Sequence, residues 1–306
     1  AFKVVKEVVL ITGANGNLAK QLTTMLEGVF QIKLLSRTPK LSNEYLWDID
    51  KQYIDPDGLK DVDHIIHLSG ASIAAKRWSV KRKREIYSSR IDTGKLILSE
   101  LQKSGQTVQS FVSASAVGYY GSLTLDCVLN EASPSGDDFL SKVCIEWESV
   151  AHSFESLGVA RRTSVLRFGI ILDKNSGALR KMITPIKHGV GSVLGTGTQW
   201  FPWIHIEDLC SMIRHVILNR SSGVFNAVSP THISHFHFMQ ALAKQLKRKI
   251  IIPNTPAIVF KILLGEMSVI LLTGTRVSSD KIKGLGFTFR HTDINKTLIN
   301  LLDDDI

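Results

Sequence analysis

Two glycines stand where a buried strand would turn into a helix, and this arrangement could bind an anion. The β-branched run 8–12 predicts a strand covered on both faces, and apolar residues recur at helical spacing over 18–26. The first glycine permits a tight turn and the second leaves room for close approach, so backbone amides at the helix N-terminus can face a phosphate. The turn therefore predicts a site for the diphosphate of a dinucleotide, unless it is a plain strand-to-helix turn. The residues expected to contact it are Gly13, Asn15, Gly16, Asn17 and Leu18.

The second predicted strand, 31–35, ends at Ser36 and Arg37. In such a fold this strand end meets the ribose of the dinucleotide. An acidic residue there would accept a bond from a 2′-hydroxyl, whereas the guanidinium of Arg37 suits a 2′-phosphate. The sequence therefore predicts NADP(H) rather than NAD(H), with a solvated surface arginine as the alternative.

Hydroxyl groups gather where another predicted strand ends, in the segment 110–121. Ser115, Tyr119 and Tyr120 could orient a substrate oxygen and deliver a proton to it. We take these three residues as the candidate catalytic groups. The alternative is that the two tyrosines pack against the strand.

Histidines and cysteines give no recognisable metal pattern. His205 and Asp208 lie in a motif that would border the pocket, but the isoleucines beside His205 favour a hydrogen-bonded core residue. The three histidines within 231–237 match no zinc spacing, so we predict no metal ligands. Cys127, Cys144 and Cys210 are odd in number and indicate reduced thiols.

The most basic part of the chain is the run 76–90. It could contact nucleic acid, but it lacks regular aromatic interleaving and no nucleic-acid recognition motif accompanies it. We therefore expect a solvated helix face with a few anion contacts and no specific nucleic-acid partner.

Strands and helices alternate along most of the chain, which predicts an α/β fold with a doubly wound parallel sheet. Further buried strands are expected at 64–71, 162–172 and 223–229, a short strand within 46–54, and a helix over 137–157. The glycine-rich segment 175–202 is expected to be an irregular loop that forms a lid or substrate wall. We place a nucleotide-binding domain at 1–229, including this loop, and a small mixed α/β substrate-side domain at 230–306.

Composition limits the class of protein. The 306 residues are 44% hydrophobic, with a formal net charge of +9. Neither a signal-peptide pattern nor an uninterrupted membrane span is present in the sequence, so we expect a cytoplasmic protein without membrane contact.

Several longer motifs together resemble extended short-chain dehydrogenases/reductases, specifically the atypical epimerase-like branch with its own small C-terminal domain. They are Thr-Gly-x-x-Gly at Thr12, Leu-Ser-Gly-Ala at Leu68, Arg77-Trp78 followed by Ser89-Arg90, Ser-Ala-Val-Gly-Tyr-Tyr-Gly at Ser115, Leu-Arg-Phe-Gly-Ile-Ile-Leu at Leu166, Phe-Pro-Trp-Ile-His-Ile-Glu-Asp-Leu at Phe201 and Leu-Leu-Gly-Glu-Met at Leu263. The resemblance runs nearly end to end.

The resemblance implies a Rossmann-like fold, NADP binding, and a substrate pocket formed by the late loops and the C-terminal domain. On matching positions, it implies diphosphate contacts from the glycine loop and 2′-phosphate contacts from Ser36 and Arg37. The other cofactor contacts that it implies are Leu68, Ser69 and Gly70 near the ribose, Glu85 and Arg90 in the basic helix, and Ile171 at a strand end.

One departure concerns the chemistry. Most short-chain dehydrogenases use a Ser, a Tyr and a Lys, with the last two in a Tyr-x-x-x-Lys segment. Here the corresponding helix start contains no Tyr: if Lys142 is the lysine, Asp138 takes the acid position, and if Phe139 takes the tyrosine position, Val143 replaces the lysine.

Three hypotheses remain open on the sequence. The first is an NADP(H)-dependent oxidoreductase or epimerase-like enzyme acting on an unidentified small polar substrate. The second is a non-catalytic NADP(H)-binding regulatory or scaffold protein, which the missing tyrosine favours. The third is a basic nucleic-acid-binding protein, which lacks a recognition motif. We expect a monomer or a homodimer.

Overall fold

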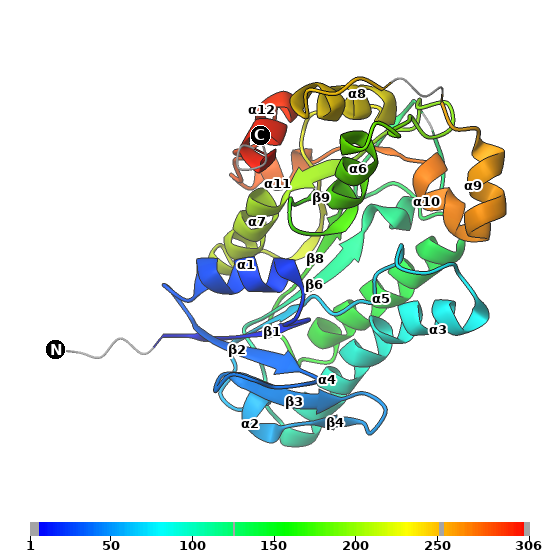
Figure 1. The fold of residues 1–306 in the computed structure, drawn as a ribbon. Coiled ribbons are helices and arrows are strands. Elements are labelled where there is room, and N and C mark those ends of the chain that lie inside the picture. Colours follow the sequence, from blue (N-terminus) through cyan, green and yellow to red (C-terminus); the bar gives the residue numbers. More distant parts are fainter. Residues whose placement is uncertain (1–5, 125, 251–253, 303–306) are drawn as a thin grey trace.

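One sheet of eight strands organises the chain in the computed structural model, which describes residues 6–124, 126–250 and 254–302 (Figure 1). The strands stand in the order β11-β8-β6-β5-β1-β2-β3-β4, and every neighbouring pair is parallel except β3 and β4. Their bounds are β1 Val8–Thr12, β2 Gln31–Ser36, β3 Glu44–Asp48, β4 Tyr53–Ile54, β5 His64–His67, β6 Ser110–Ala116, β8 Thr163–Phe168 and β11 Gly223–Ala227.

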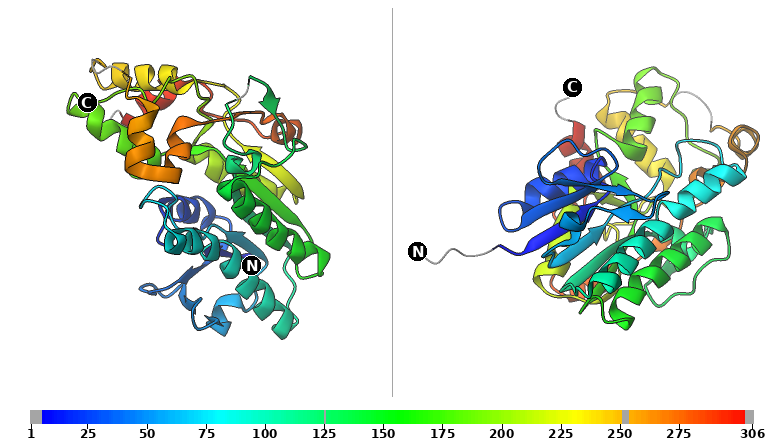
Figure 2. Two further views of the ribbon diagram at one scale, coloured as in Figure 1. Left: turned by 90° about the vertical axis from the view of Figure 1, so that its right-hand side faces the viewer. Right: turned by 90° about the horizontal axis from the view of Figure 1, so that it is seen from below.

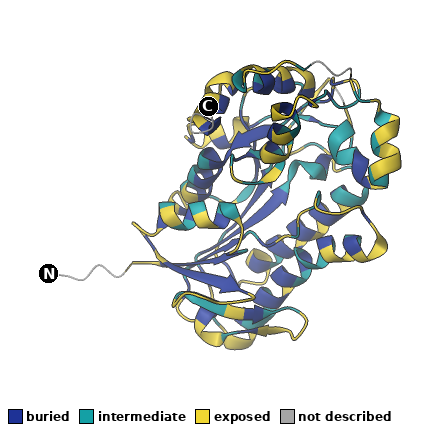
Figure 3. Cartoon of the chain, viewed as in Figure 1, coloured by how far each residue is buried: buried dark blue, intermediate teal, exposed yellow. Residues whose placement is uncertain are grey.

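Helices cover both faces of this sheet, as the doubly wound prediction requires. On one face α1 (Asn17–Leu26) and α7 (Ile206–Leu218) share a core with Val9 and Ile11 of β1. On the other face α4 (Ile91–Ser104) and α5 (Phe139–Ser156) pack around Val8 and Leu10. Figure 3 shows the sheet buried between them and the outer helix faces exposed. The fold class predicted from the sequence is confirmed.

A second group of elements lies over the carboxyl ends of the strands. A separate core joins α6 (Gly177–Lys187) with α8 (His235–Gln245) and α12 (Ile294–Leu302). Figure 2 shows this group set against the sheet-containing part of the molecule. The remaining elements are α2 Pro56–Leu59, α3 Val80–Ser88, η1 Val117–Tyr120, β7 Val128–Leu129, β9 Ile170–Leu172, β10 Trp203–His205, α9 Ala257–Leu264, η2 Gly265–Ser268, α10 Val269–Leu272, β12 Arg276–Val277 and α11 Asp280–Gly284.

Two local predictions were wrong, and a third, the short strand within 46–54, was incomplete. The segment 162–172 is two strands, because β9 leaves the sheet at Gly169 to pair with β10; a Cβ at Gly169 would lie 2.6 Å from the carbonyl oxygen of Pro202. The segment 175–202 contains the helix α6, whose Leu179, Ile183 and Ile186 are buried. The segment 46–54 overlaps two strands, since β3 and β4 form an antiparallel pair.

The boundary at residue 229 stays a prediction. The core shared by α6, α8 and α12 draws residues from both sides of it. Among the helices of the described residues, none is both long and apolar enough to cross a membrane.

Candidate functional site

The candidate site lies where the strand order of the sheet reverses. From β1 the chain first builds outward through β2 and β3, then returns to place β5 and β6 on the other side of β1. Loops after two such adjacent strands diverge and leave a crevice at the carboxyl edge, which is where α/β sheets bind nucleotides. The loops at this point are the glycine turn after β1 and residues 68–70 after β5.

The glycine turn is shaped by its contact with the neighbouring loop. Gly13 has φ +75°, and a Cβ there would lie 3.1 Å from the carbonyl oxygen of Leu68. Gly16 is the N-cap of α1, where no side chain caps the helix and no acidic residue stands in its first turn. The first amides of α1 are therefore available to an anion.

One threonine hydroxyl joins the two loops. Thr12 Oγ1 accepts hydrogen bonds from the amides of Leu68, at 3.0 Å, and Ser69, at 3.1 Å, and lies 3.0 Å from Nδ1 of His67. Desolvation lowers the pKa of His67 to about 4, so the ring is neutral. Its Nε2 then donates to the carbonyl of Arg90 at 3.1 Å while Nδ1 accepts from Thr12.

The loop after β5 also holds a buried hydroxyl that lacks a hydrogen-bond partner among the described residues. Ser69 is 6% exposed, and its Oγ has no hydrogen-bond partner among the residues that the structure describes. A buried hydroxyl without a partner is costly. A ribose hydroxyl or phosphate oxygen bound beside the glycine turn would satisfy it.

At the end of β2, the two predicted residues differ in burial. Ser36 is buried, and its Oγ accepts a bond from the amide of Thr38 at 3.2 Å. Arg37 is exposed, and no ion pair or hydrogen bond of its side chain occurs within the described part of the chain. Its guanidinium is free to meet an anion near the crevice.

The two residues predicted on the basic helix lie apart, because Glu85 is on α3 whereas Arg90 follows that helix as the N-cap of α4. The Arg90 guanidinium packs against Gly70, where a Cβ would lie 3.0 Å from Cζ, and sits 5.2 Å from the ring centroid of Trp147. Burial lowers the pKa of Arg90 to about 10, which leaves it charged at neutral pH. Glu85 is exposed on α3 and pairs with Arg82 at 2.6 Å. Arg90 therefore contacts the loop after β5, whereas Glu85 does not.

The remaining predicted cofactor residues lie around the start of α1. Asn15 is exposed, and Leu18 packs into the core below the helix. Asn17 donates from Nδ2 to Asp173, which follows β9. Ile171, on β9, packs against the same core. A hydrogen bond therefore ties the first turn of α1 to the segment that leads into α6.

Ser115 and Tyr120 belong to one buried hydrogen-bonded network. Ser115 Oγ donates to Glu148 at 2.7 Å, and Glu148 accepts two bonds of 2.8 Å from Arg167. Arg167 also donates to the Tyr120 hydroxyl at 3.0 Å, which in turn donates to Asn226 at 2.7 Å. Burial alone would lower the pKa of Arg167, but the carboxylate of Glu148 holds it above its ordinary value. The sequence analysis missed Glu148, Arg167 and Asn226, although charged residues within apolar runs were a usable signal.

Tyr119 stands apart from this network. The Arg167 guanidinium lies over its ring, with Cζ 3.4 Å from the ring centroid, and the ring meets Tyr120 edge-on. It is only partly buried, and its hydroxyl has no hydrogen-bond partner in the described ranges. Of the three predicted catalytic hydroxyls, this one alone is uncommitted.

The start of α5 carries no proton donor of the usual kind. Asp138 is the N-cap and accepts bonds from the amides and hydroxyls of Ser122 and Ser141. Burial opposes its ionisation, but these bonds bring the pKa of Asp138 below its ordinary value. Phe139 packs edge-on against Trp78, at 5.1 Å between ring centroids. Asp138 and Phe139 are the two positions at which the sequence could place the usual tyrosine. The first is an ionised helix cap and the second is an apolar ring, so neither is a proton donor of that kind.

His205 caps the start of α7 by accepting from the amide of Glu207 at 3.0 Å, and burial lowers its pKa to about 4. Within the described ranges, His205, Glu207 and His291 form a group that could hold a metal ion. However, the two imidazoles are stacked, with 3.7 Å between centroids and 17° between planes. A single ion cannot lie in both ring planes, so the arrangement favours a helix cap over a metal centre.

The fold and the crevice define a doubly wound protein of the short-chain dehydrogenase/reductase type. The model of the NAD dependent epimerase/dehydratase family matches residues 9–228, and that of a domain of unknown function, DUF1731, matches residues 255–301. The chain belongs to the NAD dependent epimerase/dehydratase family. The resemblance drawn from the motifs, including the C-terminal domain, is confirmed.

Known relatives match nearly end to end. The chain is 32% identical to the epimerase family protein YfhF of Bacillus subtilis, over 97% of this chain and 98% of YfhF. It is 31% identical to the human epimerase family protein SDR39U1, over 95% of this chain and 98% of that protein. The crystal structure of human SDR39U1 (isoform 2) with NADPH matches with a TM-score of 0.87 at 29% identity, covering 97% and 99% of the two chains.

Removing one partner of the buried ion pair between Glu148 and Arg167 should destabilise the fold. We expect Glu148→Gln to lower the free energy of unfolding by about 3 kcal/mol or more, because it leaves the Arg167 guanidinium buried without a counter-charge. Urea denaturation measures the change. Glu146→Gln, on the exposed side of the same helix, is the matched control and should change stability by less than about 0.5 kcal/mol. Equal effects of the two substitutions would contradict the assignment.

Proposed function

We propose that this protein is an NADP(H)-binding enzyme of the epimerase or oxidoreductase type that acts on a small polar substrate. The observation that carries the proposal is the crevice at the strand-order reversal, where Gly13 fits against Leu68 and the N-terminus of α1 is uncapped. The NADPH in the structure of human SDR39U1 supports the choice of nucleotide.

The residues present fit this cofactor. The amides after Gly13 and Gly16 would hold the diphosphate, and Ser36 and Arg37 the 2′-phosphate. Ser69, whose buried hydroxyl lacks a partner among the described residues, would meet the ribose. Arg90 adds positive charge beside the loop that contains Gly70.

NADP(H) bound in this crevice would supply hydride transfer to or from a substrate carbon. The chain must then supply or remove the proton on the attached oxygen. We assign this role to Tyr119, whose hydroxyl is uncommitted among the described residues and whose ring is fixed by Arg167. Tyr120 is the second candidate, but burial raises its pKa and its hydroxyl is already bonded on both sides.

Ser115 would act through the network rather than by touching the substrate. It is 1% exposed and donates to Glu148, which orients Arg167 beneath the ring of Tyr119. In this proposal Ser115 and Glu148 are positioning residues. Direct orientation of the substrate oxygen by Ser115, the role suggested by the sequence, would require this hydrogen bond to break.

A non-catalytic NADP(H)-binding protein is the alternative function. It is favoured by the start of α5, where the ionised Asp138 and the packed ring of Phe139 replace the usual proton relay. Under this alternative the nucleotide would stabilise a fold that binds a partner.

Arg37 should decide between the two nucleotides. We expect Arg37→Ala to weaken NADPH binding about tenfold to a hundredfold, because it removes a charge-assisted bond to the 2′-phosphate worth roughly 1.5–3 kcal/mol, and to leave NADH binding nearly unchanged. Calorimetric titration of both nucleotides measures this. Arg214→Ala, exposed on α7, is the control. A similar loss for both nucleotides would refute the 2′-phosphate assignment.

Turnover should be slow on ordinary substrates of short-chain dehydrogenases and should depend on Tyr119. We expect Tyr119→Phe to lower kcat by about 10² to 10⁴, the usual contribution of a positioned acid, with the Kd for NADPH unchanged. The measurement is NADPH oxidation with a panel of carbonyl compounds and nucleotide sugars.

Ser115→Ala and Tyr120→Phe separate the roles within the same assay. If they position Arg167, they should lower kcat less than Tyr119→Phe and reduce stability. Turnover that survives all three substitutions would place the active site elsewhere. Tight NADPH binding without turnover on the whole panel would favour the non-catalytic alternative.

A further inference from the structure

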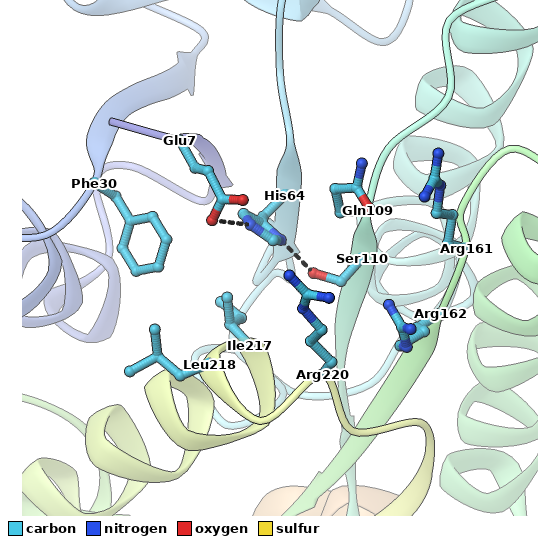
Figure 4. Close-up of a pocket in the computed structure, with 10 residues that line it drawn as sticks. All are labelled: Glu7, Phe30, His64, Gln109, Ser110, Arg161, Arg162, Ile217, Leu218 and Arg220. Carbon is cyan, nitrogen blue, oxygen red and sulfur yellow. Dashed lines mark hydrogen bonds and ion pairs between the residues drawn. The ribbon is translucent and has the colours of Figure 1, made fainter. Parts of the chain in front are cut away.

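A cavity of about 350 Å³ opens at the amino edge of the sheet (Figure 4). Its polar lining includes His64, Ser110, Arg161, Arg162 and Arg220, and Phe30 forms part of an apolar wall. It belongs to no site described above, because every loop of the nucleotide crevice follows the carboxyl end of a strand.

The topology explains why these residues meet. His64 and Ser110 are the first residues of β5 and β6, and Arg162 directly precedes β8. Parallel strands begin at the same edge, so these side chains converge there. Since β1 rises about 3.3 Å per residue, its five residues separate this cavity from the glycine turn by roughly 13 Å.

The cavity carries an excess of positive charge. The guanidinium groups of Arg161, Arg162 and Arg220 make no ion pair or hydrogen bond with any described residue. Among the described residues that line the cavity, Glu7 is the one acidic residue, and it is bonded to His64 at 3.2 Å. Arg161 and Arg220 are exposed and Arg162 is half-buried, so water screens their repulsion, and an anion bound between them would replace that water.

Arg220 is held there in an unusual backbone conformation. It follows the C-cap of α7 with φ +51°, a position where glycine would carry no strain. Its amide donates to the carbonyl of Ile217 at 3.1 Å, and the next amide donates to Val216 at 2.9 Å. The turn thus places a guanidinium at the cavity although its geometry favours a residue without a side chain.

The rest of the lining indicates the shape of the ligand. His64 is 5% exposed and donates or accepts at both ring nitrogens, with Ser110 Oγ 2.7 Å from Nδ1, so the floor is rigid. Phe30 and Ile217 are buried, and Leu218 presents an apolar side chain at the mouth. A compact dianion attached to a small aromatic or aliphatic group matches both halves of the cavity.

We propose that this cavity binds a small phosphate monoester with an apolar group, at a site separate from the nucleotide crevice. The arginines bind the phosphate, for which the planar fork of a guanidinium is suited, and the wall formed by Phe30 and Ile217 contacts the organic part.

The probe for this site is phenyl phosphate, titrated calorimetrically with NADPH present and absent so that binding at the diphosphate crevice is recognised. We expect one saturable site that persists with NADPH and binds phenyl phosphate more tightly than inorganic phosphate or phenol. Arg162→Ala and Arg220→Gly should each raise the Kd for phenyl phosphate about tenfold or more. Because Arg220→Gly also relieves backbone strain, its melting temperature should not fall, so lost binding is not lost folding.

The controls are Arg214→Ala on α7, outside the cavity, and Arg37→Ala in the crevice, and both should keep the wild-type Kd for phenyl phosphate. Absence of saturable binding, or equal losses in the cavity and control variants, would overturn the proposal. A complex with single-stranded RNA that Arg162→Ala abolishes, without phenyl phosphate binding, would instead indicate a macromolecular partner. None of these outcomes depends on NADPH binding, so the two proposals fail separately.

Discussion

The hydroxyl of Thr12 is the contact on which the crevice depends. It sits at the end of β1, accepts the amides of Leu68 and Ser69, and donates to a neutral His67. These bonds bring the loop after β5 against the glycine turn, where a Cβ at Gly13 would crowd the carbonyl of Leu68 and the positive φ favours glycine. The same hydroxyl thus fixes both walls of the crevice, and neutrality of His67 is required because a protonated ring could not accept at Nδ1.

A second constraint is the buried hydrogen-bonded network that supports the proposed catalytic residue, Tyr119. The carboxylate of Glu148 is shared by Ser115 and Arg167, and the guanidinium supports the ring of Tyr119. A buried pair of this kind contributes little net stability compared with apolar packing, but it has one satisfied geometry. Its value here is positional, since it fixes an arginine and a tyrosine at the end of two adjacent strands, β6 and β8.

Features with a local cause could be predicted from the sequence. The strand at 8–12, the glycine turn and α1 follow from short-range patterns. The alternation of strands and helices predicts the doubly wound parallel sheet. Gly169 was missed as a break because its cause is the carbonyl of Pro202, distant in sequence. The helix α6 was missed because flanking glycines hid the spacing of Leu179, Ile183 and Ile186. The hydrogen bond between Ser115 and Glu148 could not be predicted, since it depends on how α5 lies against the sheet.

The two edges of a parallel sheet differ in how they can bind anions. At the carboxyl edge, helices begin, and the N-terminus of α1 offers unpaired amides and a positive dipole end without any charged side chain. At the amino edge, helices end, and the C-terminus of α7 presents carbonyl groups and a negative dipole end. An anion can be held there only if side chains reverse the local potential, and a lone arginine would be partly neutralised by the helix end. Arg161, Arg162 and Arg220 line the same cavity, and together they supply the positive charge that an anion at the amino edge needs.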